Sequence, residues 1–430
     1  MEEDKYLYTY KDSVKIPILS MVDDALLVSE CGYKTSMLNS FINTKTSMKK
    51  LQYGTAKCFK MHVGKKCIEE VCPELYIDGW KLKEVEEVDT DSFAVEDEYE
   101  GLVNMETVQH EKYLGDILTN DGKNTRNIAA RKNRGIGVVN QILTILEEIC
   151  FGKYYFQVAM VLRNSLLISS LLTNSEAWYN LSSKDVTELE RVDEDLLRKV
   201  LECPISTPRE MLYLELGVSP IRNIIRSRRL IFLQYILQEE KNSLIYKFLK
   251  AQMDNSVTND WCLTVAQDME VFKLGVQVEE IETMSEAKFK ALVKEKEKEA
   301  TLEYLNSEKI SKNHTKVMHI MHSELAMQDY LKPNTSTIEE SKFTFLARSR
   351  MLDVRNNFKG QYTHTDTLCP LGCLDEDTQQ HLLVCDELNE THSVVSEVPV
   401  YEHLFCDTLE KKLNIARILK SQLKKRKKLL

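Results

Sequence analysis

The spacing of apolar residues changes near residue 123, and this change constrains the fold more than any other feature. Before it, apolar segments are short, and the turn-forming pair Asp78-Gly79 separates two of them as in a β-hairpin. Tyr113 to Leu118 is a further expected strand. After residue 123, apolar residues recur every three or four positions, as in Val186, Leu189 and Val192. The sequence therefore predicts an α+β protein, with antiparallel strands first and a mainly α-helical remainder.

Helix-capping signals place several of the expected helices. One begins at the capping box Ser182 to Asp185 and ends before Pro204. The next has Thr207 as its N-terminal cap and Gly217 as its stop. A third follows over Ser219 to Leu237. Connections this short between successive helices are typical of a helical bundle.

Charge and cysteine content limit the class of protein. The chain has 57 Lys and Arg against 67 Asp and Glu, and this net charge of −10 gives no hint of a nucleic-acid partner. Its 11 cysteines are irregularly spaced, and Met1 to Tyr10 has no secretory pattern, which favours reduced thiols in a nuclear or cytoplasmic protein. No apolar run reaches the roughly 18 residues of a membrane span, so we expect no membrane insertion.

A compact set of cysteines and one histidine follows the spacing C-x3-C-x7-H-x3-C, formed by Cys369, Cys373, His381 and Cys385. Three thiolates and one imidazole suit a closed tetrahedral Zn²⁺ site, in which the metal is structural and has no open position for catalysis. The loop with Pro370 and Gly372 would wrap the metal. The alternative is a set of free cysteines beside a histidine on a helix face.

Basic residues gather in three places despite the acidic average. Residues 122–134 contain no acid and five bases: Lys123, Arg126, Arg131, Lys132 and Arg134. A predicted helix over Phe343 to Lys359 presents four more, Arg348, Arg350, Arg355 and Lys359. Both sets are candidate contacts for nucleic-acid phosphates, and ordinary solvated helix faces are the alternative.

Residues 411–430 hold nine bases and no acid. Leu409, Leu413, Ile418 and Leu419 give this segment the pattern of an amphipathic helix. The terminal run Lys424 to Lys428 is a candidate nuclear-localisation signal or RNA-binding tail, or a solvated chain end.

Two adjacent acids, Asp23 and Asp24, stand between the apolar runs Ile16 to Val22 and Ala25 to Val28. A tight turn would hold both carboxylates at the tip of a hairpin, where they repel each other unless a cation lies between them. Mg²⁺ prefers such oxygen ligands, and paired ions of this kind support phosphoryl transfer. An ordinary surface turn is the alternative.

The order of these segments resembles the C-terminal half of LINE-type (non-LTR) retrotransposon reverse transcriptases. The resemblance rests on four motifs in order: MVDD with its flanking runs, LQYGTAK over Leu51 to Lys57, KYLG over Lys112 to Gly115, and the Cys/His cluster as a CCHC knuckle. It implies an RNA-directed DNA polymerase of target-primed reverse transcription. It also implies that Asp23 and Asp24 bind Mg²⁺, and that Lys57 contacts phosphate or acts as a general acid.

The resemblance divides the chain into five segments: a palm remnant over 1–122, a helical thumb-like domain over 123–250, a helical region over 251–365, the zinc knuckle over 366–390 and a basic tail over 391–430. Only 22 residues precede Asp23, so we expect this chain to lack the fingers and the first catalytic aspartate of the family. We therefore expect no polymerase activity from this chain alone, but retained binding of RNA or an RNA/DNA duplex. The oligomeric state is not predicted.

Two other functions fit the same residues. A domesticated, zinc-dependent nucleic-acid-binding protein without catalysis would keep the knuckle and the basic segments, while the paired aspartates would be only structural. A degenerate gene product would fold poorly, because half of its sheet is missing and the exposed strand edges favour aggregation.

Overall fold

The computed structural model describes residues 8–10, 14–16, 18–21, 24–28, 38–39, 42, 53–54, 58–61, 63, 76–82, 97–149, 152–254, 260–311, 322–358, 367–388 and 399–430. The chain divides into two compact units. The first consists of Met1–Ile128, Ala177–Leu181 and Leu233–Ala266, and the second of Ala129–Glu176, Ser182–Phe232 and Gln267–Leu430. Short strands lie in the first unit and helices form most of the second, which agrees with an α+β class. The five sequence segments stay a prediction.

The strands of the first unit are short and pair mostly with a neighbour in sequence. They are β1 (Tyr8–Tyr10), β2 (Val14–Ile16), β3 (Ile18–Met21), β4 (Asp24–Leu27), β5 (Tyr53–Gly54), β6 (Phe59–Lys60), β7 (Tyr76–Leu82), β8 (Asp97–Asn104), β9 (Glu106–Thr107), β10 (His110–Tyr113) and β11 (Asp116–Thr119). The pairs β1–β2, β3–β4, β7–β8 and β10–β11 are antiparallel, whereas β5–β7 and β6–β9 are parallel. Helix α8 (Leu244–Asp254) belongs to the same unit and lies against β2.

One turn prediction and one strand prediction in this unit are wrong. Asp78 and Gly79 form no hairpin turn, because β7 runs straight through them and pairs with β8. The register shifts between Gly79 and Trp80, so the permissive glycine accommodates an irregularity within a strand instead of a reversal. The single strand expected over Tyr113 to Leu118 is instead a hairpin, with its turn at Leu114 and Gly115. Both turn residues have positive φ, +47° and +89°, as two-residue hairpin turns require.

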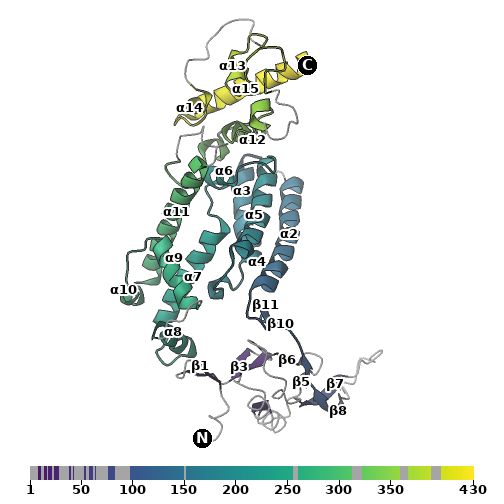
Figure 1. Ribbon diagram of the computed structural model, residues 1–430, viewed down its shortest axis with the longest axis vertical. Helices are drawn as coiled ribbons and strands as arrows, with labels where there is room; N and C mark the ends of the chain where they lie inside the picture. The colour runs from purple at the N-terminus through teal and green to yellow at the C-terminus, as the bar shows by residue number, and fades with distance from the viewer. Residues whose placement is uncertain are drawn as a thin grey trace. The chain divides into compact units, whose positions relative to one another are not determined.

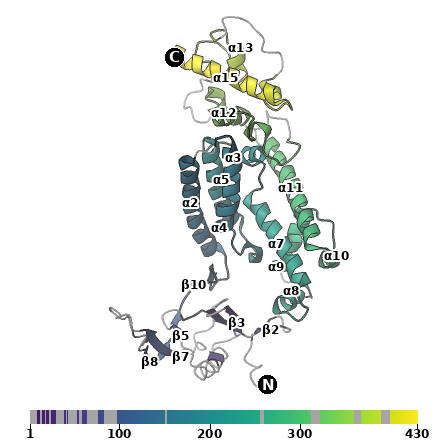
Figure 2. The same ribbon diagram turned by 180° about the vertical axis from the view of Figure 1, so that it is seen from behind.

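Apart from α8, the helices within the described residues are α2 (Thr125–Glu148), α3 (Tyr155–Leu162), α4 (Ser169–Leu171), α5 (Ser183–Leu201), α6 (Arg209–Leu216), α7 (Ile221–Gln238), α9 (Trp261–Val271), α10 (Val278–Thr283), α11 (Glu286–Ser311), α12 (Ile338–Arg348), α13 (His381–Val384), α14 (Val400–Leu404) and α15 (Leu409–Leu429). Shorter turns are η4 (Gly152–Tyr154), the π-helical η5 (Arg163–Ile168), η6 (Ser175–Ala177), η7 (Asp329–Leu331) and η8 (Arg355–Phe358). Both ribbon views show α2, α3 and α5 side by side (Figures 1 and 2). None of the described helices combines the length and the apolar character needed to cross a membrane.

Local capping chemistry explains where two bundle helices begin and end. The Ser182 hydroxyl accepts the N–H of Asp185 at 3.1 Å and the Asp185 carboxylate accepts the N–H of Ser182 at 3.2 Å, which confirms the predicted capping box of α5. Thr207 is not the cap of α6, because the position is taken by Pro208, without a side-chain hydrogen bond. Gly217 ends α6 at φ +66°, as predicted. A Cβ there would lie 2.2 Å from the backbone of Ala326, so only glycine fits.

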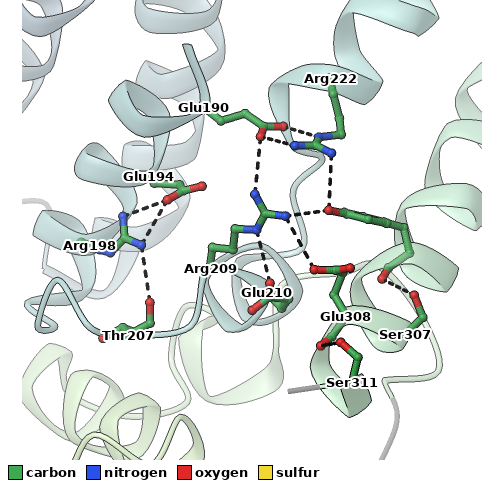
Figure 3. Close-up of polar contacts among 11 residues, drawn as sticks. Glu190, Glu194, Arg198, Thr207, Arg209, Glu210, Arg222, Ser307, Glu308 and Ser311 are labelled. Carbon is green, nitrogen blue, oxygen red and sulfur yellow. Dashed lines mark hydrogen bonds and ion pairs between the residues drawn. The ribbon is translucent and has the colours of Figure 1, made fainter. Parts of the chain in front are cut away.

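Ion pairs between distant helices hold the bundle together. Figure 3 shows Glu190 of α5 between the guanidinium groups of Arg209 and Arg222. Arg222 donates two hydrogen bonds to Glu190 at 2.7 and 2.6 Å, and Arg209 donates one to the Tyr304 hydroxyl of α11 at 2.6 Å. The hydrogen bonds of Arg209 and Arg222 link α5, α6, α7 and α11. Arg163 of η5 is also buried, at 1% exposed, so several basic residues of the bundle are structural.

The C-terminal part of the second unit has its own apolar core. It combines residues from α12 and the segment that follows it, the Cys/His segment, α14 and α15: Ala347, Leu352, Val354, Cys369, Leu382, Leu383, Cys385, Leu388, Val400, Leu404, Ile415, Leu419 and Leu423. We call residues 338–358, 367–388 and 399–430 the C-terminal module. The amphipathic helix expected around Leu409 to Leu419 is α15, and it is a packed element rather than a solvated tail.

Candidate metal centre

A tight loop brings the first two cysteines of the cluster together. Leu368 and Glu376 form an antiparallel bridge at its base. The N–H of Cys369 donates to the Asp375 carbonyl at 2.9 Å, and the N–H of Gly372 donates to the Cys369 carbonyl at 3.2 Å. Gly372 adopts φ +94°, a conformation that side chains rarely take, so the loop can turn back toward Cys373.

The other two members of the cluster come from one helical turn, as the spacing predicts. His381 is the first residue of α13, and Cys385 follows its last residue. The N–H of His381 donates to the Thr378 hydroxyl at 3.0 Å, which fixes the start of the turn. His381 and Cys385 therefore face the loop from a single short helix.

The geometry of the four side chains suits a metal ion. Their ligand atoms all lie within 4.8 Å of one another. Cys385 Sγ is 3.5 Å from Cys373 Sγ and 3.9 Å from Cys369 Sγ. Sulfurs bound about 2.3 Å from one tetrahedral ion lie about 3.8 Å apart, so these distances match a shared ion. Cys369, Cys373, His381 and Cys385 can thus hold a metal ion together.

The histidine ring has one nitrogen without a partner and one near a carboxylate. His381 Nε2 is buried and has no hydrogen-bond partner among the described residues. His381 Nδ1 lies 3.7 Å from the Asp375 carboxylate, whose side chain is 79% exposed. Metal-binding histidines are commonly oriented by a carboxylate on their other nitrogen. Nε2 is therefore the candidate metal-binding nitrogen, and Asp375 lies near the other nitrogen of the ring.

Burial and crowding disfavour the charged thiolates. Burial, followed by hydrogen bonds and repulsion from the neighbouring thiols, raises the pKa of the Cys385 thiol to about 12. Burial also raises the pKa of Cys369. A divalent cation reverses this preference, because coordination stabilises the thiolate form. The charged thiolate form of these cysteines is therefore favourable only when a cation lies between them.

A buried ion pair fastens the Cys/His segment to α15. The Asp377 carboxylate, 1% exposed, accepts two hydrogen bonds from Arg426 Nη1 at 2.8 and 3.1 Å. It also accepts the N–H of Arg355 at 2.7 Å. Gln379 adds a bond from its side-chain amide to the Ala347 carbonyl of α12 at 3.0 Å. Asp377 and Arg426 are not predictable as a pair from the sequence, because nothing local indicates that residues 49 apart bind each other.

The helix predicted over Phe343 to Lys359 is wrong, and so is the role expected of Arg348. Helix α12 ends at Arg348. Arg348 is 1% exposed, and its guanidinium donates to Glu215 at 2.9 Å through both Nε and Nη2, and to the Leu404 carbonyl through Nη1. Phosphate therefore cannot reach Arg348 while the protein is folded. This arginine instead joins α12 to α6 and α14.

The Glu215–Arg348 pair lies in a larger buried polar cluster. His322 Nε2 lies 3.0 Å from the Glu215 carboxylate, and the Tyr330 hydroxyl donates to it at 2.6 Å. Burial alone would raise the pKa of Glu215, but Arg348 and His322 lower it below its usual range. Burial lowers the pKa of His322 and lowers that of Lys309 to about 8. The cluster is fully enclosed, so we assign it to stability.

Arg350 and Arg355 lie outside any basic helix face. Arg350 has φ +59° and is half-buried. Arg355 folds back onto the metal segment, and its guanidinium donates to the Leu368 carbonyl at 3.1 Å. A phosphate contact by either residue stays a prediction.

The basic residues near α2 have different environments. Lys123, Arg126 and Arg134 are exposed. Arg131 is 4% exposed, and Lys132 forms an ion pair with Glu188 of α5. Three of the five predicted phosphate contacts are therefore accessible to a ligand, whereas Arg131 is buried.

The residues of the polymerase resemblance are only partly described. The hairpin expected around the paired aspartates is present, because Met21 of β3 pairs with Asp24 of β4. Asp23 and Lys57 lie outside the described residues, and so does Val22. The Mg²⁺ site and the role of Lys57 stay predictions.

Comparison of the chain with protein-family models, curated proteins and solved structures finds no match. The likeness to reverse transcriptases thus rests on the order of the sequence motifs, and the metal centre rests on geometry.

Proposed function

We propose that this protein binds nucleic acid, that a structural Zn²⁺ ion stabilises its C-terminal module, and that the chain derives from the C-terminal half of a LINE-type reverse transcriptase. The observation that carries the proposal is the convergence of Cys369, Cys373, His381 and Cys385 within 4.8 Å. This cluster stands where the order of motifs in the resemblance puts a CCHC knuckle.

Zinc fits the ligands better than other common metals. Three thiolates and an imidazole are soft or borderline ligands, which favour Zn²⁺ over Mg²⁺ or Ca²⁺. Four protein ligands fill a tetrahedral shell and leave no position for a substrate. The ion would therefore hold the loop of Cys369 and Cys373 against α13, and supply folding energy rather than chemistry.

The proposed ligand is RNA or an RNA/DNA duplex. Lys123, Arg126 and Arg134 are exposed, and residues 122–134 contain no acid to repel a phosphate backbone. Contacts of this kind follow the shape of a duplex and carry no sequence specificity. The affinity would therefore fall steeply as salt concentration rises.

Two measurements on the purified full chain test the zinc-dependent binding. Elemental analysis should find one zinc ion per chain, and filter binding should find affinity for an RNA/DNA duplex. Cys385→Ser should lose the zinc and weaken the binding, whereas Cys406→Ser, a free cysteine outside the cluster, should change neither. Zinc-free wild-type protein that binds the duplex with full affinity would overturn the proposal.

We further propose that this chain does not polymerise DNA, because two neighbouring aspartates are too few ligands for a two-metal site. Primer extension with Mg²⁺ and deoxynucleotides should give no product. Incorporation that disappears in Asp23→Asn would contradict this expectation.

A further inference from the structure

Helix α15 has one face in the core and one face in solvent. Its buried residues include Leu413, Ala416, Leu419 and Leu423. On the opposite side, exposed residues recur at three- and four-residue spacing: Lys411, Asn414, Arg417, Ser421, Lys424, Lys425 and Lys428. Glu410, Lys427 and Leu429, near the ends of the helix, are exposed as well. Glu410 is the single acid of the helix. The exposed face of α15 is therefore strongly basic.

Part of this charge has no partner. Arg417 and Lys420 bind Glu340 and Glu339 of α12 at 2.9 and 2.7 Å. In contrast, Lys411, Lys425 and Lys428 form no ion pair with any residue that the structure describes, and Lys424 interacts only at longer range with Glu339. Unpaired lysines on an ordered helix are available to an external anion.

Buried contacts fix the orientation of this face. Arg426 lies within the terminal basic run but is 5% exposed, because it binds Asp377 beside the metal cluster. Lys412 binds Asp329 of η7 at 2.8 Å near the other end of the helix. The helix is thus held at both ends, and its free lysines project from a rigid support.

The fixed helix disfavours two other partners for this charge. A membrane-binding helix needs a free apolar face, whereas the apolar face of α15 is part of the core. A receptor that reads residues 424–428 as a localisation signal would need Arg426, which is buried. Helix-dipole stabilisation explains cations in the last turn but not Lys411 in the first.

A phosphate backbone fits the remaining features. From Lys411 to Lys428 the helix extends about 26 Å, at about 1.5 Å per residue, which spans several successive phosphates of a nucleic acid. We propose that the exposed face of α15 binds the phosphate backbone of an RNA/DNA duplex, in an orientation that the metal centre and the Asp377–Arg426 pair fix. This inference rests on the proposed function and adds a second contact surface to it.

A triple substitution tests the surface. Lys424→Gln, Lys425→Gln and Lys428→Gln together should weaken binding of a labelled RNA/DNA duplex of about 16 base pairs at least about tenfold at about 0.1 M salt. The slope of log affinity against log salt should become shallower by about 2 to 3. The matched control removes three exposed lysines of α11, through Lys288→Gln, Lys290→Gln and Lys298→Gln, and should leave the slope unchanged. Thermal melting should show both variants folded.

The possible outcomes separate this inference from the proposed function. If the wild type binds the duplex and the α15 variant binds equally well, the α15 surface is wrong and the proposed function stands. If the α15 and α11 variants lose the same affinity, only net charge matters and the surface is again wrong. If the wild type binds no duplex, both proposals fail. Tighter binding to phosphatidylserine vesicles than to the duplex would overturn α15 as a nucleic-acid surface.

Discussion

Helices α7 and α15 look alike in sequence but use their positive charge differently. Helix α7 carries Arg222, Arg226, Arg228 and Arg229 and no acid, and α15 carries nine bases and one acid. The arginines of α7 are bound inside the second unit. Arg222 binds Glu190, Arg229 binds Asp268 at 2.6 and 3.0 Å, and Arg228 binds the Leu172 carbonyl.

The difference shows that the surroundings of a basic helix decide its role. The hydrogen bonds from Arg222 to Glu190 raise the pKa of the arginine, because they stabilise its charged form. Acids of α5 and α9 meet α7 from two sides. On one side of α15, basic residues instead form ion pairs with acids of α12, η7 and the Cys/His segment. The other side faces solvent.

Metal removal should produce the largest difference between α7 and α15. A chelator takes away the ion that we expect at the cluster, and the loop of Cys369 then loses its link to α13. Hydrogen exchange should show lost amide protection in α13, α14 and α15, with α5, α6 and α7 still protected. The same result is expected for Cys385→Ser but not for Cys406→Ser. Unchanged protection of α15 after complete metal loss would show that the core and the Asp377–Arg426 pair suffice without the ion.

Removal of a buried arginine should have the next largest effect. Arg229→Met leaves the Asp268 carboxylate, which is 3% exposed, with Arg226 at 3.4 Å as its nearest remaining cation. The free energy of unfolding should fall by about 3 kcal/mol, because an incompletely paired charge stays buried. Urea denaturation measures this change. Lys425→Met on α15 serves as the control and should change stability by less than about 0.5 kcal/mol. Equal losses in the two variants would remove the distinction between the helices.

Several features that depend on neighbours in sequence were predicted correctly. The capping box of α5 lies within four residues, and Gly217 ends α6 through its own backbone conformation. The four metal ligands also lie close in sequence, so their spacing alone indicated the loop and the helical turn that bring them together. In each case the residues that create the feature are close enough to be recognised as one pattern.

Features that depend on distant partners were not predictable in this way. Glu215 binds Arg348 across 133 residues, and only the folded chain shows that this arginine is buried. Asp78 and Gly79 have the composition of a hairpin turn, but β8 was available as a partner and extended the strand through them. Local propensity gave way to tertiary pairing at both places.

Lys309 of α11 is a third case, a buried lysine. Its titration should have the smallest effect on the free energy of unfolding. Its side chain is fully buried, and Nζ lies 5.1 Å from the centre of the Phe405 ring. Burial lowers its pKa from 10.5 to about 8, although Glu215 opposes the shift. Between these two pH values the unfolded chain holds a proton that the folded protein has released, so stability should rise with pH, by up to about 1 kcal/mol per pH unit.

The comparison of wild type with Lys309→Met isolates this contribution, because other groups titrate equally in both proteins. Urea denaturation at several pH values from 8 to 10 should give a wild-type curve that gains stability relative to the variant as pH rises. Below pH 8 the difference between the two should be constant, since Lys309 is then protonated in both the folded and the unfolded state. Parallel curves through the whole range would mean that Lys309 keeps its proton when buried, held by Glu215, and would place it with the paired arginines of α7.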